Sequence, residues 1–294
     1  MDRPTPSQQA VLQSGARIRV VRAAPGSGKT WLVAEALREE LLGWRSAHRG
    51  IAALSFTNVA GEEIRRALGA TPPHPHFVGT IDAFLYRYVV RPFARVINPA
   101  MQAPPRLLPA DAADALSQRQ YWYRDTSIGY LIERGKSKLS GTLYDCHFVG
   151  LDLRGKPQFL FDAGWSRIHL TPMENADVLE RKKELWRYTG RMSHSDVAYI
   201  AAAVLQSSRG QHARDLLARR FPFLVVDELQ DTGYYRSRSL LSLLEDTGVR
   251  GLLVGDPDQA IYGFNGARPD IFREFELIPD AACFEVRDTI RCGT

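Results

Sequence analysis

Short apolar segments bounded by turn residues alternate along this chain with longer amphipathic segments. This alternation predicts an α/β domain with a mainly parallel sheet, because buried strands are continuous apolar runs and crossover helices carry one apolar face. Between the first two runs, Trp31–Leu42 has apolar residues at helical spacing opposite charged ones, which predicts an amphipathic helix. The expected strands are Ile18–Ala23, Ile51–Phe56, Phe77–Gly79, Phe223–Val226, Gly251–Val254 and Cys283–Val286.

The middle of the chain has a different pattern, which begins at the proline-rich passage Pro99–Pro109. Prolines disfavour regular structure, so this passage is expected to connect the sheet domain to an insertion. A mixed helical stretch near Ala110–Tyr123 follows, and Leu143–Leu153 with Gln158–Phe161 then predicts an antiparallel hairpin. We therefore expect an inserted subdomain at residues 96–195 between two halves of one sheet domain, residues 1–95 and 196–294.

Two helix starts are visible toward the end of this insertion. Thr171 is followed by Pro172 and by Glu174, a capping pattern that predicts a helix running toward Gly190. A second start at Ser193–Asp196 predicts a helix toward Ser208. The basic run Arg181–Lys183 in the first helix, and the cluster Tyr121–Arg124, are either DNA contacts or a solvated helix face and a core patch.

Composition limits the class of protein. The chain has 294 residues, 45% hydrophobic and 24% charged, which is ordinary soluble usage and excludes disordered and disulfide-scaffold classes. A net charge of +5 is compatible with a polyanionic partner or with chance. Three cysteines without paired spacing indicate neither a disulfide framework nor a zinc site, and His74–His76 is expected to be a surface turn. No apolar run is long enough to span a membrane, so we expect a cytoplasmic protein with no membrane partner.

The segment AAPGSGKT (Ala23–Thr30) follows a predicted strand and opens a predicted helix. In this context two glycines turn backbone amides toward an anion and the helix N-terminus adds a positive dipole, so the segment predicts a phosphate-binding loop for ATP. Lys29 would reach the β and γ phosphates, and the Thr30 hydroxyl would ligate Mg²⁺. Ala23 stands where the strict pattern has glycine. The expected cradle is Ala24, Pro25, Gly26, Ser27, Gly28, Lys29 and Thr30.

Two later strands end in acidic and amide side chains. The run Phe223–Val226 is followed by Asp227 and Glu228, and ligands of open α/β sheets gather at the carboxyl ends of strands. Asp227 is expected to hold Mg²⁺ and Glu228 to orient and deprotonate the attacking water. The other run, which ends in GDPDQ, places Gln259 where it can hydrogen-bond a γ-phosphate. Taken alone, each pattern is also that of an ordinary strand exit or turn.

Six segments stand out in chain order: Pro6–Gln9, Ala23–Thr30, Leu54–Asn58, Val78–Phe84, Val225–Thr232 and Gly255–Ala267. Read together, they resemble the successive motifs of UvrD/Rep-type superfamily 1 DNA helicases. The resemblance spans nearly the whole chain, and it is strongest in the sheet domain. It implies a RecA-like P-loop NTPase lobe interrupted by an inserted mixed α/β subdomain, and movement along single-stranded DNA from 3′ to 5′.

The resemblance also implies roles for further residues. Gln9 would contact the adenine edge, Gln259 would couple the γ-phosphate to DNA, and Arg291 would contact the γ-phosphate. Phe56 and Phe264 would stack on bases; such stacking is worth about 1–3 kcal/mol per contact and tolerates any base, which suits a translocating enzyme. The alternative for these two phenylalanines is a place in the hydrophobic core. The residues implied to contact DNA are Phe56, Thr57, Asn58, Thr80, Tyr262 and Phe264.

The sequence departs from the family pattern at several positions. Asp82 stands where histidine is frequent and Arg236 where glutamine is frequent, while Asn265 replaces an arginine. The chain stops soon after Arg291, before most of a second lobe. We therefore expect it to bind nucleotide, to hydrolyse it weakly and not to unwind duplex alone, because arginine fingers and lobe closure carry much of the rate.

Two functions from different classes follow. The first is the motor lobe of an ATP-dependent helicase or translocase acting on single-stranded DNA. The second is an ATP-dependent regulatory or interaction module that partners a nuclease and never unwinds. A P-loop kinase is disfavoured by the Gln-Asp pair that follows Asp227-Glu228.

Overall fold

The structure is a computed structural model that describes residues 4–108, 129–134, 137–162, 167–245, 247–259 and 271–288. The chain divides into two compact units. One combines Met1–Phe84 with Leu205–Thr294, and the other is Leu85–Val204. The chain thus leaves the first unit once and returns to it once.

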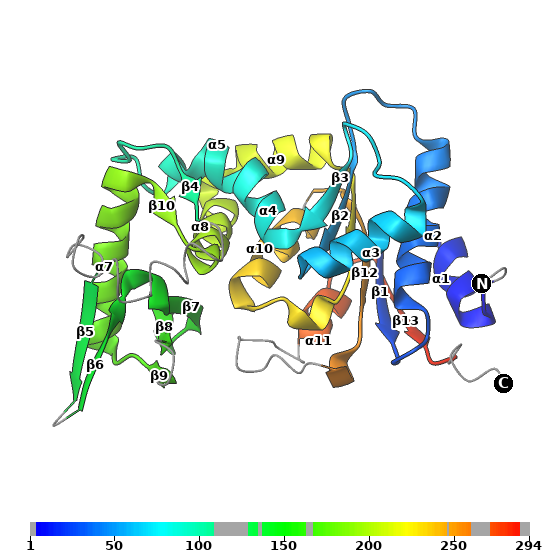
Figure 1. The fold of residues 1–294 in the computed structure, drawn as a ribbon. Helices are drawn as coiled ribbons and strands as arrows, with labels where there is room; N and C mark the ends of the chain where they lie inside the picture. Colours follow the sequence, from blue (N-terminus) through cyan, green and yellow to red (C-terminus); the bar gives the residue numbers. More distant parts are fainter. Residues whose placement is uncertain are drawn as a thin grey trace. The chain divides into compact units, whose positions relative to one another are not determined.

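The first unit is built on a six-stranded parallel sheet, which confirms the predicted α/β class (Figure 1). Its order is β13-β1-β12-β11-β2-β3. Strand positions are confirmed for all six predicted runs; β1, β2, β11 and β12 are almost entirely buried, while β3 and β13 are only partly buried. Their bounds are β1 Ile18–Ala23, β2 Ile51–Ser55, β3 Phe77–Thr80, β11 Phe223–Val226, β12 Arg250–Gly255 and β13 Ala281–Val286.

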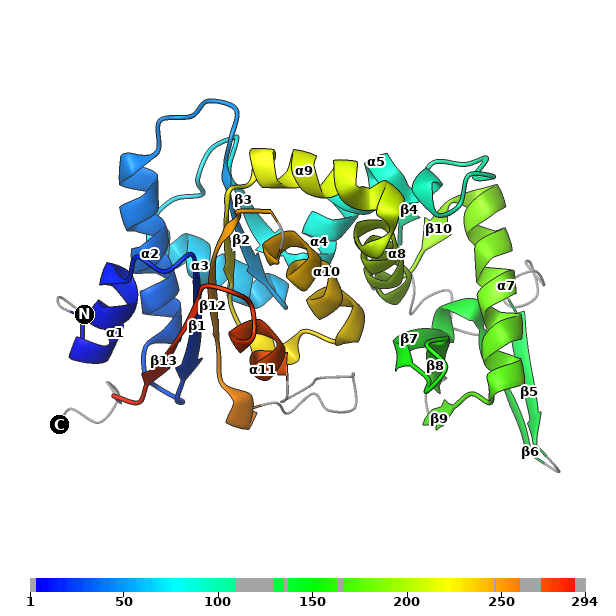
Figure 2. The same ribbon diagram turned by 180° about the vertical axis from the view of Figure 1, so that it is seen from behind.

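Helices cover both faces of this sheet (Figures 1 and 2). The helices α1, α2 and α3 supply Val11, Leu37 and Ile64 to a core that includes alternate residues of the strands, such as Val21 and Val225. Helices α10 and α11 lie on the opposite face. Helix bounds are α1 Pro6–Gln13, α2 Lys29–Gly43, α3 Asn58–Leu68, α4 Ile81–Leu85, α9 Gln211–Arg220, α10 Tyr234–Leu244 and α11 Ile271–Glu276.

The strand order determines which loops are neighbours. β12 pairs with β1 on one side and with β11 on the other. All three strands are parallel, so the loops that leave them emerge at the same edge of the sheet. The loops after β1, β12 and β11 are therefore adjacent, although they are far apart in the sequence.

The described residues of the second unit include small sheets and the long helices α7 and α8. β7 and β8 pair antiparallel, which confirms the predicted hairpin, and β9 extends this sheet. Thr171 forms the predicted capping box at the start of α7, and Gly190 ends that helix in a left-handed conformation. The bounds are α5 Arg91–Phe93, β4 Arg106–Leu107, β5 Gly129–Arg134, β6 Ser137–Thr142, β7 Cys146–Leu151, β8 Pro157–Asp162, β9 Arg167–His169, α7 Pro172–Thr189, β10 Arg191–Met192 and α8 His194–Gln206.

Two expectations for this unit need correction. The proline-rich passage contains one short strand, β4, which pairs with β10 in parallel. Lys182 is not on a solvated face, because its Nζ lies 2.6 Å from Asp196 Oδ1 and both side chains are fully buried. Lys182 is therefore a structural cation and is not exposed to a nucleic acid strand. The helical stretch near Ala110–Tyr123 and the cluster Tyr121–Arg124 lie outside the described residues.

No helix in the described part of the chain has the length and apolar character needed to span a bilayer.

Candidate functional site

The loop after β1 has the backbone expected of an anion cradle. Gly26 and Gly28 adopt φ values of 73° and 79°, a left-handed conformation that glycine tolerates without steric cost. Gly28 is the N-cap of α2, and no side chain caps that helix start. The first amides of α2 are therefore available to an anion, which the helix dipole also favours.

Gln8 anchors this loop from α1. Its Nε2 donates a hydrogen bond of 2.9 Å to the carbonyl oxygen of Ser27, and its side chain is fully buried. Gln8 also closes a capping box with Thr5 at the start of α1. By contrast, Gln9, the glutamine predicted to contact adenine, is exposed on α1. The Thr-x-x-Gln spacing of a capping box was the signal that could have identified Gln8 as the ordered glutamine.

Lys29 begins α2 and faces the loop after β12. Its Nζ lies 3.9 Å from Oδ2 of Asp256, and only 11% and 3% of the two side chains are exposed. Sequence reasoning chose Gln259 from this loop and missed Asp256. Asp256 Oδ2 and Ser27 Oγ are buried and have no hydrogen-bond partner among the described residues. Buried polar atoms of this kind cost free energy unless a ligand satisfies them.

The predicted acids follow β11 directly. Asp227 is 3% exposed, and its Oδ1 accepts a hydrogen bond of 3.0 Å from the backbone N–H of Glu228. Burial, and then the neighbouring Glu228, raise the pKa of Asp227 to about 7, while Lys29 acts in the opposite direction. Burial and Glu228 likewise raise the pKa of Asp231 to about 6. Burial and mutual repulsion therefore disfavour the ionised forms of these neighbouring carboxyl groups, and a bound cation would favour them.

Glu228 is held in an unusual backbone conformation. Its φ of 54° and ψ of 50° are left-handed, which is uncommon for a residue other than glycine. Gln230 braces it, because Gln230 Nε2 donates to Glu228 Oε2 at 2.6 Å. The Oε1 of the same amide accepts from the backbone N–H of Asp256 at 2.9 Å. One buried side chain thus ties Glu228 to the end of β12, at a turn whose strain marks it as a functional candidate.

Gly255 is required by this contact. A Cβ at Gly255 would lie 2.3 Å from Gln230 Oε1 and 2.8 Å from the backbone nitrogen of Leu229. Any side chain there would displace the amide that joins the two loops. Neither Gln230 nor Gly255 was predicted as a site residue, although both stand inside the motifs that carried the resemblance.

The described residues offer few ligands for a metal. No cluster of three or more histidine, cysteine or acidic side chains suited to a metal occurs among the described residues. Thr30, in the first turn of α2, and Asp227 are the predicted ligands, and one hydroxyl with one carboxylate matches Mg²⁺ that is otherwise bound by phosphates and water. Gln259 is half-buried and ends a short 3₁₀ turn after β12.

Several residues predicted to contact DNA lie at the carboxyl ends of β2 and β3. Ser55 of β2 pairs with Thr80 of β3, so the loops that follow are adjacent. Thr57 caps α3 by accepting from the N–H of Ala60 at 3.1 Å, while Thr80 Oγ1 accepts from the N–H of Ala83 at 3.2 Å. Asn58 begins α3 and is exposed, and Phe56 is half-buried. The predicted residues Tyr262, Phe264 and Arg291 lie outside the described residues.

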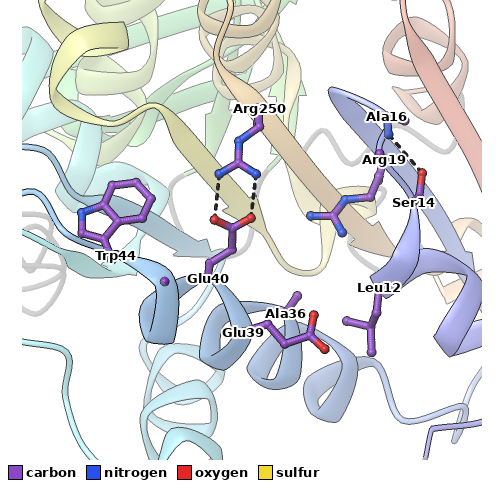
Figure 3. A pocket seen from close by; sticks show the side chains of 11 residues that line it. Leu12, Ser14, Ala16, Arg19, Ala36, Glu39, Glu40, Trp44 and Arg250 are labelled. Atoms are coloured by element: carbon purple, nitrogen blue, oxygen red, sulfur yellow. Dashed lines mark hydrogen bonds and ion pairs between the residues drawn. The ribbon is translucent and has the colours of Figure 1, made fainter.

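A separate pocket of about 470 Å³ lies beside the start of β1 and the end of α2 (Figure 3). It contains none of the predicted site residues. Two of its charged residues, Arg250 and Glu40, form a bidentate ion pair with both contacts at 2.7 Å.

Comparison with known proteins gives the family. The relatives include the Gabija protein GajB of Bacillus cereus, 24% identical over 292 residues, which cover 97% of this chain and 46% of that protein. The ATP-dependent DNA helicase Rep of Escherichia coli is 26% identical over 275 residues, 91% of this chain and 38% of Rep. A third relative, from Lactobacillus helveticus, belongs to an ATP-dependent helicase/nuclease and is 30% identical over 107 residues, 35% of this chain and 9% of that protein.

The chain spans less than half the length of each of these relatives. The family model described as "UvrD/REP helicase N-terminal domain" matches residues 4–278, which include the phosphate loop, the acids after β11 and the end of β12. The chain therefore belongs to the UvrD/REP helicase family, whose N-terminal domain covers nearly its whole length.

Proposed function

We propose that this chain is the ATP-binding motor lobe of a DNA helicase or translocase that couples ATP hydrolysis to movement on single-stranded DNA. The observation that carries the proposal is that Lys29, Asp256 and Asp227 lie in the segments that follow three adjacent parallel strands. An anion cradle, a cation and buried acids on one sheet edge suit a triphosphate with its metal.

The chain's own groups divide the work of hydrolysis. The amides of the loop and Lys29 bind the phosphates and balance their charge. Thr30 and Asp227 would hold Mg²⁺, which when bound neutralises charge on the β and γ phosphates. Glu228 orients the attacking water and accepts its proton, and the Gln230 amide keeps that carboxylate in place. Gln259 and Arg291 complete the contacts to the γ-phosphate.

Single-stranded DNA would run along the ends of β2 and β3. Phe56 offers a ring for stacking, while Thr57, Asn58 and Thr80 offer hydroxyl and amide groups to the backbone. Tyr262 and Phe264 are proposed as further contacts to DNA. A strand bound here lies at the same sheet edge as the nucleotide, so movement of one loop relative to another can couple the two ligands.

One observation favours a second function, an ATP-dependent module that partners a nuclease without unwinding DNA. It is the name of the Lactobacillus helveticus relative, which couples helicase with nuclease. This function predicts ATP-dependent capture of a nuclease and no stimulation of ATP turnover by DNA.

The test compares the wild-type chain with Lys29→Ala and with a matched control, Lys156→Ala, whose lysine is exposed in a hairpin turn of the other unit. Binding of a fluorescent ATP analogue, binding of oligo(dT) with and without nucleotide, and ATP turnover with and without oligo(dT) are measured. We expect Lys29→Ala to weaken nucleotide binding and to reduce any turnover by roughly 10²-fold or more. The control should match wild type.

Unchanged nucleotide affinity in Lys29→Ala would refute the site. Nucleotide binding without any oligo(dT) binding or stimulation would refute the motor and favour the module.

A further inference from the structure

A bidentate ion pair joins α10 to α4 in the first unit. Arg236 of α10 donates from Nε to Asp82 Oδ1 at 2.6 Å and from Nη2 to Asp82 Oδ2 at 2.8 Å. The side chains are 18% and 13% exposed, so the pair is largely screened from water. Two parallel bonds between a guanidinium and a carboxylate fix the plane of the guanidinium as well as its position.

The guanidinium held in this way faces an aromatic ring. Its central carbon lies 5.6 Å from the centroid of the Phe56 ring, within the range of a cation–π contact. Phe56 itself comes directly after β2 and immediately before Thr57, the N-cap of α3. Three segments far apart in the sequence, the loop after β2, the start of α4 and the start of α10, therefore meet at the Arg236 guanidinium.

We propose that Asp82 and Arg236 are positioning residues that hold the Phe56 ring in the orientation in which it stacks on a DNA base. The proposal rests on the single-stranded DNA binding given under the proposed function. Asp82 fixes Arg236, and Arg236 restrains the ring, so less rotational freedom is lost when a base arrives. Asp82 and Arg236 thus form a charged pair that acts through a neighbouring ring.

A direct contact between Arg236 and a DNA phosphate is the competing interpretation. The structure argues against it, because both oxygens of Asp82 already engage the guanidinium and neutralise its charge. A phosphate drawn to this place would also approach the Asp82 carboxylate. The two interpretations differ in salt dependence, since only a phosphate contact releases counterions.

The test is a double-mutant cycle on the chain, with fluorescein-labelled oligo(dT) and a non-hydrolysable ATP analogue. The variants are Phe56→Ala, Arg236→Met and the double variant, each titrated at several salt concentrations. We expect Phe56→Ala to weaken oligo(dT) binding about ten-fold or more, as loss of a stacked base does. Arg236→Met should weaken it several-fold with the wild-type salt slope, and it should have no further effect once Phe56 is already alanine.

Further variants guard against simple misfolding. The double substitution Asp82→Asn with Arg236→Gln removes the guanidinium without leaving a buried charge, and it should weaken oligo(dT) binding as Arg236→Met does. Arg236→Lys keeps the charge and loses the flat face, so it should recover only part of the affinity. Affinity for the ATP analogue and the thermal melt should stay near wild type in the Asn–Gln variant.

Three outcomes overturn the proposal. Equal losses from Arg236→Met with and without Phe56 would show that Arg236 acts independently of the ring. A salt slope lowered by about one would indicate a direct phosphate contact. Failure of the wild-type chain to bind oligo(dT) would overturn the proposed function itself, an outcome distinguishable from the other two.

Discussion

The two edges of the parallel sheet are built differently from the same kinds of residue. At the carboxyl edge, the Ser27 hydroxyl, one oxygen of Asp231 and one oxygen of Asp256 are buried without a hydrogen-bond partner among the described residues. Glu228 is held there in a left-handed conformation. This edge carries unsatisfied groups and strain, features that a structure retains where a ligand is to bind.

At the amino edge, charged groups are satisfied by the protein. Arg17 donates to the carbonyl oxygens of Leu244, Val249 and Pro279, at 2.7, 3.0 and 3.1 Å. Arg250 pairs with Glu40 through two bonds of 2.7 Å. A charged residue at a strand end is therefore not by itself evidence of a ligand site. The two edges differ in whether the surrounding protein supplies hydrogen-bond partners for the buried polar groups and charged side chains.

The largest expected effect is that of Glu228→Gln at the carboxyl edge. Loss of the proposed general base should reduce ATP hydrolysis by roughly 10²–10⁴-fold, while the amide keeps the shape of the side chain and nucleotide binding persists. Single-turnover phosphate release and nucleotide titration measure the two quantities. Glu40→Gln is the matched change at the amino edge and should leave both at wild-type values. Equal losses of ATP hydrolysis in Glu228→Gln and Glu40→Gln would contradict the proposed difference between the two edges.

A smaller effect is expected from Gly255→Ala. The new methyl group would collide with Gln230 Oε1 and with the backbone of Leu229, so the link between the two loops must shift. We expect the free energy of unfolding to fall by roughly 1–3 kcal/mol, together with a loss of hydrolysis. Urea denaturation and phosphate release are the measurements. Gly43→Ala, where nothing lies within 4 Å of the added carbon, should be neutral or slightly stabilising.

The ion pair at the amino edge should matter little to stability. Arg250 is 47% exposed, and an exposed pair contributes at most about 1 kcal/mol. Arg250→Met should therefore shift the urea midpoint only slightly and leave nucleotide affinity unchanged. A loss of nucleotide affinity in Arg250→Met would show that the amino edge affects the nucleotide site, which contradicts this prediction.

The smallest effect concerns pH. His76 Nδ1 accepts the backbone N–H of Ile51 at 3.1 Å, so the bonded ring nitrogen carries no proton. Burial, followed by Arg220 and His74, lowers the pKa of His76 below its ordinary value of 6.5. As pH falls through 6.5 the unfolded chain takes up a proton that the folded ring resists, so stability present above that pH is lost below it.

His76→Asn keeps an acceptor that does not titrate, so it should remove this loss. Free energies of unfolding from urea denaturation are compared for wild type and the variant at pH 7 and pH 5.5. Wild type should lose more stability than the variant when the pH falls, by less than about 1 kcal/mol, because solvent reaches part of the His76 ring. A constant difference would contradict the assignment.

Local pattern was sufficient for the strands and for the residues that follow them. Each predicted strand is a short, mainly apolar run; Asp227 follows such a run directly, and Lys29 follows one after a short glycine-containing loop. Pattern was also sufficient for the start of α7, since its capping box involves only Thr171 and its neighbours.

Long-range contacts were beyond that reasoning. Asp256 became a partner of Lys29 only because β12 lies between β1 and β11, and that order is not written in any one segment. Gln230 likewise bonds to a residue 26 positions away. Lys182 looked solvated beside Arg181 and Lys183, and its burial depends on Asp196 of another helix.

The end of β12 combines a fixed main chain with a side chain whose partner can change. Gln230 holds the amide of Asp256, while the carboxylate of Asp256 lies near the ammonium of Lys29. A triphosphate that takes over this ammonium would release the carboxylate without moving the peptide behind it. On nucleotide binding, Lys29 would then exchange the Asp256 carboxylate for phosphate, while Gln230 keeps the Asp256 main chain in place.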